Sequence, residues 1–204
     1  MTGNIAMKLN INLSNYNIIL GSKSPRRKEI LNKMGINFKI THIDFNEQAD
    51  LSKPIEDIAE SIAFQKSNEF NHLNKNDILI CADTIVAVGN EIFGKPKTKQ
   101  EAFEMLSKLS GKKHKVITGV TIKSNKKNKI FHETTFVNFK KLNEEEINYY
   151  IEKYNPLDKA GAYAIQEWIG LVGIKKIEGS YFNVVGLPSH RLYNELIKFI
   201  HEKN

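Results

Sequence analysis

Short, nearly unbroken apolar runs alternate along the chain with longer segments in which apolar residues recur every three or four positions. Runs of the first kind lie at 18–20, 78–82 and 85–88, and they predict strands that are buried on both faces. The longer segments lie at 54–70 and 99–109 and predict amphipathic helices. Because strands and helices interleave in this way, the pattern predicts an α/β protein.

Alternating apolar and polar positions at 115–123 and 129–139 predict two more strands, which are joined by a lysine-rich hairpin. Gly89-Asn90 predicts the turn of a second hairpin. Because hairpins introduce antiparallel pairs, we expect a mixed sheet flanked by helices. A strand at 171–177 and a closing helix at 189–200 follow in the C-terminal part.

Positive charge is in excess, since the 204 residues include 30 Lys and Arg against 23 Asp and Glu, for a net charge of +7. This balance would suit a polyanion, but the lysines are spread from end to end, which is typical of a solvated surface. We therefore do not expect nucleic acid as a partner. The arginines are more informative, because the chain has three of them, Arg26, Arg27 and Arg191, and two are adjacent. A guanidinium can bind phosphate with two parallel hydrogen bonds, although chance placement is the alternative.

Several classes of protein are excluded by the sequence. The single cysteine, Cys81, allows no intramolecular disulfide, and no apolar run approaches the roughly 18 residues that span a bilayer. The polar segment at 1–17 has no signal-peptide pattern, so we expect a cytoplasmic protein with no membrane partner. The six histidines have no metal-ligand spacing, which argues against structural zinc.

The segment at 22–27, Ser-Lys-Ser-Pro-Arg-Arg, joins the end of a predicted strand to the start of a helix predicted at 26–34. Ser24 suits the N-cap of that helix and Pro25 suits its first position. Backbone N–H groups at a helix start attract anions, and the serine hydroxyls and guanidiniums add to them. Because the spacing of a Walker A loop is absent, this is a triphosphate cradle of another kind or an ordinary capped helix.

Asp83-Thr84 follows the apolar run at 78–82, which would place both residues at the carboxyl end of a strand, where open α/β sheets bind ligands. A carboxylate there can hold a divalent metal or accept a proton from water, and the alternative is a turn-capping role. Lys95 lies between Gly and Pro after a hairpin strand, with a solvated lysine as the alternative. Gln166 ends a Gly- and Ala-rich stretch, and its amide can either read a base edge or lie on the surface.

Seven short motifs follow one another along the chain: Ser-Lys-Ser-Pro-Arg-Arg at 22–27, Ala-Asp-Thr-Ile-Val at 82–86, Gly-Lys-Pro at 94–96, Leu-Ser-Gly at 109–111, Thr-Gly-Val at 118–120, Pro-Leu-Asp-Lys-Ala-Gly-Ala-Tyr at 156–163, and Gly-Ser-Tyr-Phe-Asn-Val-Val-Gly-Leu-Pro at 179–188. Each motif is common alone. As an ordered set over residues 18–200 they resemble the Maf family of nucleoside triphosphate pyrophosphatases.

The resemblance implies hydrolysis of a nucleoside triphosphate to the monophosphate and pyrophosphate, with a divalent metal, Mg²⁺ or Mn²⁺. It implies an elongated mixed sheet flanked by helices, with a central cleft, as in the Ham1-type inosine triphosphatases. It further implies a single catalytic domain over 16–204, with two lobes around the cleft, and a disordered extension at 1–15. Family members are often dimers, which makes a homodimer one expected state.

The resemblance also assigns roles to individual residues. Asp83 resembles the proton acceptor, and Glu47 together with Asp83 resembles the metal ligands. The positions that match phosphate-binding residues are Ser22, Arg27, Lys66 and Lys95. The positions that match the specificity residues are Arg26, Thr84 and Gln166.

Within the family, the Arg26, Thr84 and Gln166 signature is similar to that of the members that act on dTTP and UTP, and it differs from that of the 7-methyl-GTP type. Two positions depart from the usual pattern, because Ala164 and Glu167 stand where glycine is common. Their side chains would tighten the base pocket. The alternatives left open are the same reaction on other non-standard nucleotides, and a non-catalytic protein that binds nucleic acid through its basic surface.

Overall fold

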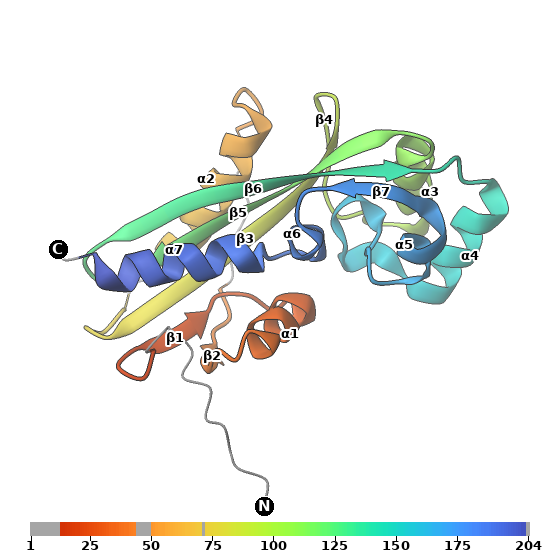
Figure 1. Cartoon of the computed structure of the whole chain (residues 1–204). Coiled ribbons are helices and arrows are strands. Elements are labelled where there is room, and N and C mark those ends of the chain that lie inside the picture. Colours follow the sequence, from red (N-terminus) through yellow and green to blue (C-terminus); the bar gives the residue numbers. More distant parts are fainter. Residues whose placement is uncertain (1–12, 44–49, 71, 203–204) are drawn as a thin grey trace, which may run out of the picture.

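A computed structural model describes residues 13–43, 50–70 and 72–202, so that the extension predicted at 1–15 lies mostly outside the described residues. A seven-stranded sheet runs through the molecule in the order β2-β1-β3-β5-β6-β7, with β4 paired to β3 (Figure 1). The strands are β1 Asn17–Leu20, β2 Phe38–Ile40, β3 Asp77–Val88, β4 Glu91–Phe93, β5 Lys113–Lys123, β6 Asn128–Phe139 and β7 Ile174–Glu178. β1 pairs in parallel with β2 and β3, and the remaining pairs are antiparallel. The prediction of an α/β protein with a mixed sheet is confirmed.

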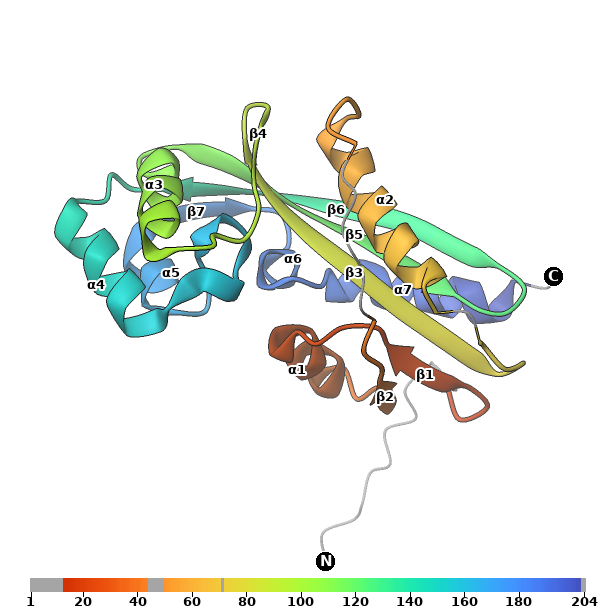
Figure 2. The ribbon, with the colours of Figure 1, turned by 180° about the vertical axis from the view of Figure 1, so that it is seen from behind.

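Helices flank this sheet on both faces. They are α1 Pro25–Lys33, α2 Ile55–Asn68, α3 Lys99–Leu109, α4 Glu144–Tyr154, α5 Trp168–Gly173, α6 Tyr181–Val185 and α7 Ser189–His201, with 3₁₀ turns η1 Pro156–Asp158 and η2 Ala160–Ala162. Figures 1 and 2 show α2 and α7 on opposite faces of β3, β5 and β6. Within the described part of the chain, no helix has both the length and the hydropathy that crossing a membrane requires.

The start of α1 follows from its sequence. Ser24 is the N-cap, its hydroxyl accepts from the Arg27 N–H over 3.4 Å, and Pro25 occupies the first helical position. The helix ends before Gly35, whose φ of 69° lies in the left-handed region that favours glycine. These local signals place the two adjacent arginines in the first turn of α1, with their side chains directed from a fixed helix start.

Two apolar clusters form the main core. The first gathers side chains of α3, α4 and α5 with the β4–β7 end of the sheet, and the second gathers β1, α1 and α7 with the other end. Val185 of α6 packs against both clusters, so this helix lies where they meet. The arrangement is consistent with one domain of two lobes over 16–204, which stays a prediction.

Strand β3 corrects one expectation, because it does not end before Asp83. It continues to Val88, and its pairing with β5 is unbroken from Leu79 to Ala87. Pairing through the backbone does not depend on side-chain polarity, so the polar pair at 83–84 did not interrupt the strand. Asp83 and Thr84 therefore lie in the middle of β3.

The strand predicted at 171–177 is partly wrong. Trp168–Gly173 is helix α5, and β7 begins only at Ile174. Ile169 and Gly173 are buried whereas Leu171 is 81% exposed, which is the four-residue spacing of a helix face. The apolar residues of this segment belong to two different elements, and their sequence alone did not separate them.

Candidate active site

A cavity of about 380 Å³ lies between the two apolar clusters and is lined by segments that are far apart in the sequence. They are the turn and helix start at 22–27, residues 42–43, part of α2, the middle of β3, the loop after β4, the segment at 158–166 and the end of α6. The predicted site residues that line it are Ser22, Arg26, Arg27, Lys66, Asp83, Thr84, Lys95 and Gln166. Glu47, the remaining predicted site residue, lies outside the described residues.

Arg27 lines this cavity and is 8% exposed. Its Nε donates to the Gly186 carbonyl over 2.8 Å, its Nη1 to Ser22 Oγ over 3.2 Å, and its Nη2 to Thr84 Oγ1 over 3.1 Å. Gly186 has a φ of 124°, which a residue with a side chain rarely adopts. Through these three hydrogen bonds, the Arg27 guanidinium fixes α1 against β3 and against the end of α6.

The Thr84 hydroxyl belongs to a directed chain of hydrogen bonds. It lies 3.0 Å from Thr118 Oγ1, and the Thr118 hydroxyl donates to the Asn183 carbonyl over 3.1 Å. A hydroxyl has one hydrogen. Because Thr118 donates its hydrogen to the Asn183 carbonyl, Thr118 Oγ1 must accept a hydrogen bond from the Thr84 hydroxyl. Thr84, which also accepts from Arg27, can therefore present to a ligand only an acceptor lone pair.

Asp83 reaches the cavity from the other face of β3, because successive side chains of a strand point to opposite faces. β1 accompanies β3 as far as Ile80 and β4 joins it from Val86, so Asp83 lies in the interval between these neighbours. The carboxylate is neither fully buried nor fully exposed. This position suits a group that must meet both a charged ligand and water.

A chain of ion pairs runs along the cavity wall from the start of α1 to the segment that follows α4. Arg26 Nη1 lies 2.9 Å from Asp158 Oδ2, and Asp158 Oδ1 lies 2.8 Å from Lys159 Nζ. Lys159 Nζ is in turn 3.5 Å from Glu167 Oε1. Burial would raise the pKa of Asp158, but hydrogen bonds from Lys159 and Arg26 outweigh it and lower that pKa, so the group is a carboxylate at neutral pH.

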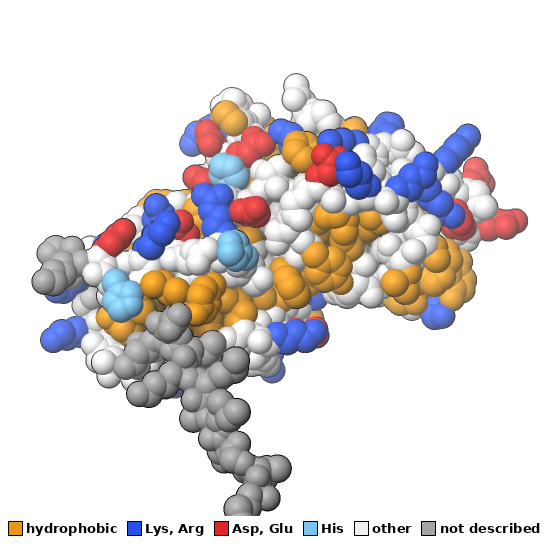
Figure 3. Space-filling view, in the orientation of Figure 1, with side chains coloured by type: hydrophobic (Ala, Val, Ile, Leu, Met, Phe, Trp, Pro, Cys, Tyr) orange, Lys and Arg blue, Asp and Glu red, His pale blue; other side chains and the backbone are white. Residues whose placement is uncertain are grey.

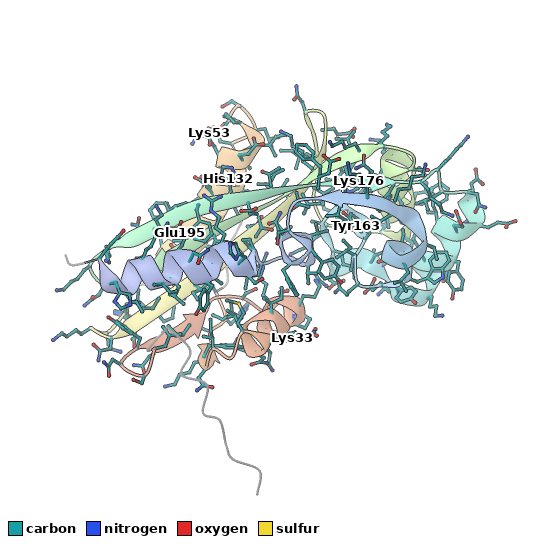
Figure 4. All side chains as sticks on the ribbon, in the orientation of Figure 1. Lys33, Lys53, His132, Tyr163, Lys176 and Glu195 are labelled. Atoms are coloured by element: carbon teal, nitrogen blue, oxygen red, sulfur yellow. The ribbon has the colours of Figure 1, made fainter. Side chains whose placement is uncertain are left out.

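Asp158, Lys159 and Tyr163 line the cavity although the sequence analysis assigned them no role. Tyr163 lies in the half of the molecule that holds α3, α4 and α5 (Figure 4). A usable signal was present, since a lysine in a close-packed Gly- and Ala-rich run needs a partner, and Lys159 is only 6% exposed. Its partners are Asp158, the residue directly before it, and Glu167.

The charge on the cavity wall is strongly unbalanced. The cationic side chains that line it are Lys23, Arg26, Arg27, Lys66, Lys95 and Lys159, against the carboxylates of Asp83 and Asp158. On the face shown in Figure 3, by contrast, basic side chains are dispersed among acidic ones. Fold and site together define an α/β protein whose central cavity is built for a small polyanion.

The fit of a divalent metal can be judged from the donors on the wall. In the described part of the chain, no cluster of three or more His, Cys, Asp or Glu side chains is placed to hold an ion. The carboxylates among the described lining residues are those of Asp83 and Asp158, and Asp158 forms ion pairs with Arg26 and Lys159. Mg²⁺ is commonly held by one or two carboxylates together with phosphate oxygens and water. The donor set therefore fits an ion that arrives with a phosphate ligand.

Comparison with known proteins identifies the family. The sequence model described as "Maf-like protein" matches residues 17–199. The chain is 44% identical over 191 residues to a dTTP/UTP pyrophosphatase of Bacteroides thetaiotaomicron, covering 92% of this chain and 98% of that one. It is 49% identical over 185 residues to the protein of the same name from Christiangramia forsetii, covering 90% and 94%. The chain belongs to the Maf family, as its motifs predicted.

Two solved structures of Ham1 proteins also match. The Staphylococcus aureus protein has a TM-score of 0.46 at 17% identity and covers 88% of this chain and 99% of its own. The Coxiella burnetii protein has a TM-score of 0.43 at 13% identity and covers 61% and 73%. The assignment of the family rests on the sequence relatives.

Proposed function

We propose that this protein is a nucleoside triphosphate pyrophosphatase that hydrolyses dTTP and UTP to the monophosphate and pyrophosphate. The observation that carries the proposal is the cavity itself, in which a single strand, β3, presents Asp83 among cationic side chains from several elements. Relatives that share 44–49% of their residues with this chain are named dTTP/UTP pyrophosphatases. Arg26, Thr84 and Gln166, the signature of that subgroup, all line the cavity.

The triphosphate binds against the cationic wall. A nucleoside triphosphate carries about four negative charges at neutral pH, and its oxygens accept from guanidinium, ammonium and hydroxyl donors. Ser22 and Arg27 hold it from the α1 side, Lys66 from α2 and Lys95 from the loop after β4. Because Arg27 is held by three partners, it does not need to be ordered when the substrate binds.

The reaction is attack of water on the α-phosphorus. The water oxygen forms a bond to phosphorus, the bond to the bridging oxygen of pyrophosphate breaks, and the water proton passes to the Asp83 carboxylate. The cationic side chains stabilise the charge that develops on the leaving pyrophosphate. A divalent ion, held by Asp83 and phosphate oxygens with Glu47 as a further proposed ligand, would supply additional charge neutralisation and a more acidic water.

Base selection falls to Arg26, Thr84 and Gln166. Thymine and uracil present a donor N–H at position 3 between two carbonyl oxygens, whereas cytosine presents an acceptor there. Thr84 can offer only an acceptor, and the Gln166 amide has both a donor and an acceptor. The Gln166 amide complements a thymine or uracil edge when its Oε1 accepts from N3–H and its Nε2 donates to a neighbouring carbonyl, and it complements a cytosine edge only with these two atoms exchanged.

The test is hydrolysis of a nucleotide panel by the purified protein with Mg²⁺ or Mn²⁺. The panel holds dTTP, UTP, CTP, 7-methyl-GTP, ITP and modified pyrimidine triphosphates, and pyrophosphate and orthophosphate are measured separately. Pyrophosphate from dTTP and UTP at the highest kcat/KM supports the proposal. A higher kcat/KM on another nucleotide would overturn the substrate but keep the reaction. No pyrophosphate from any nucleotide, together with salt-dependent binding of DNA or RNA, would favour the non-catalytic alternative.

A further inference from the structure

The segment that carries Gln166 is anchored on both of its flanks by one buried cluster. On the N-terminal flank, the Ala164 N–H donates to Tyr150 Oη over 3.1 Å. On the C-terminal flank, Glu167 Oε2 accepts a short hydrogen bond from the Tyr150 hydroxyl, and Glu167 Oε1 lies 3.5 Å from Lys159 Nζ. Gln166 lies between these two attachment points.

Tyr150 is the fixed centre of the cluster. It is fully buried in α4, and its hydroxyl uses its hydrogen toward Glu167 and a lone pair toward Ala164. Burial, and then the hydrogen bond to Glu167, raise the pKa of Tyr150, so it remains a donor throughout the physiological range. The Gln166 backbone is therefore tied to the core of the α3–α5 half.

The Gln166 side chain itself is exposed on the cavity wall. Among the described residues, no side-chain hydrogen bond holds its amide. The direction of the amide therefore depends on the backbone at 164–167, and this backbone is held by Tyr150 and Glu167. Removing either anchor would leave the cavity lining in place but would broaden the orientations of the amide.

The same cluster reaches the opposite wall of the cavity. Lys159 pairs with Asp158 as well as with Glu167, and Asp158 holds Arg26 at the start of α1. Two of the proposed specificity residues, Arg26 and Gln166, are thus connected through Lys159. A change of charge at Glu167 would therefore affect the positions of both Arg26 and Gln166.

We propose that Glu167 is a positioning residue for base selection: acting with Tyr150 and Lys159, it sets the orientation in which Gln166 meets the base of the nucleotide. The inference rests on the proposed function. Glu167 does not line the cavity, which corrects the expectation that its side chain tightens the base pocket, because the side chain is directed to Tyr150 and Lys159. Its effect is therefore transmitted through the backbone and through Lys159. It is expected to govern which nucleotide is preferred and not the rate of the chemical step.

The experiment compares the wild type with Glu167→Gln and Tyr150→Phe. The matched control is Glu152→Gln, which makes the same change at an exposed ion pair with Lys99 elsewhere on α4. Values of kcat and KM are measured for dTTP, UTP, CTP and ITP. In parallel, Kd is measured by calorimetry for non-hydrolysable α,β-imido analogues of dTTP and CTP. Folding is checked by thermal melting, and Glu167→Gln is expected to fold because the side chain is partly exposed.

Glu167→Gln and Tyr150→Phe are each expected to lower the dTTP-to-CTP preference by about tenfold, mainly through KM, with kcat for dTTP within about threefold of the wild type. The double variant should lose little more than either single one, because both act on one unit. The control should keep the wild-type preference.

Equal losses on every nucleotide, or a fall confined to kcat, would overturn the inference. The calorimetry distinguishes failure of the inference about Glu167 from failure of the proposed function. If the wild type binds the analogues selectively without releasing pyrophosphate, only the proposed function fails, and the change in Kd ratio decides the role of Glu167. A wild type with no base preference in binding overturns the inference directly.

Discussion

Arg27 and Thr84 are separated by 57 positions in the chain, and Arg27 Nη2 donates to Thr84 Oγ1 over 3.1 Å. This bond joins the helix start that is proposed to hold phosphate to the strand that is proposed to select the base. The same guanidinium also reaches Ser22 and Gly186, so its planar shape satisfies three acceptors from separate elements. The proposed phosphate-binding and base-selecting residues are thereby joined through one side chain.

Arg27→Lys is expected to preserve the positive charge but lose this fork. An ammonium cannot reach three acceptors spread around a plane, so at least one buried acceptor loses its donor. We expect the free energy of unfolding to fall by about 1–3 kcal/mol, and kcat/KM for dTTP to fall by at least about tenfold. Urea unfolding and a pyrophosphate assay measure the two effects. A lysine variant with wild-type stability would show that the charge alone is required.

Asp83→Asn is expected to reduce kcat by at least about 100-fold, because an amide cannot accept the water proton. The fold should be retained, since the backbone at this position pairs with Gly119 in the centre of the sheet. Pyrophosphate release and a circular dichroism melt test the two statements. Asp57→Asn, at an exposed position on α2, is the control with the same chemical change. Full activity in a folded Asp83 variant would remove this residue from the mechanism.

Much of the architecture could be predicted because its signals are local. The cap at Ser24, the turn at Gly89 and the alternation along β5 and β6 each specify an element from neighbouring residues. The length of β3 could not be predicted in this way. Its continuation through Asp83 depends on pairing with β5, which lies more than 25 positions further along the chain. Tertiary pairing of this kind overrides local polarity.

The candidate site shows the same division. The resemblance predicted site residues that all line the cavity, apart from Glu47, which lies outside the described residues, and it assigned no role to Asp158, Lys159 and Tyr163, which line the cavity too. It did not predict how they are connected. In the Arg26–Asp158–Lys159–Glu167 chain, the hydrogen bond between Arg26 and Asp158 joins two residues that are 132 positions apart in the sequence. Such contacts require the folded backbone and have no periodic or capping signature.

A buried histidine gives the fold an expected pH dependence. His114 is 2% exposed, its Nε2 lies 2.8 Å from Tyr163 Oη, and burial lowers its pKa from 6.5 to about 4. Between these two values the unfolded chain binds a proton that the folded chain does not, so stability rises with pH through this window and is lost as the pH falls. The full effect is about 3 kcal/mol.

Urea unfolding at half-unit steps from pH 7 to pH 4.5 measures this slope. His114→Gln should flatten the profile between pH 6.5 and 5, where ordinary carboxylates stay ionised. His190→Gln removes an exposed histidine and should leave the profile unchanged. An equal slope in the His114 variant would assign the pH dependence to other groups.

Close contact between α2 and the sheet depends on Gly119. A Cβ added there would lie 2.1 Å from the Ala59 carbonyl oxygen, which belongs to the helix backbone and cannot move as a flexible side chain would. Gly119→Ala must therefore push α2 outward, and α2 carries Lys66 on the cavity wall. We expect a loss of about 1–3 kcal/mol in the free energy of unfolding and an increase in KM for the triphosphate. Gly94→Ala is the matched control, because a Cβ there meets no atom within 4 Å. Equal stability in the two alanine variants would mean that α2 is not held against β5 as closely as the structure shows.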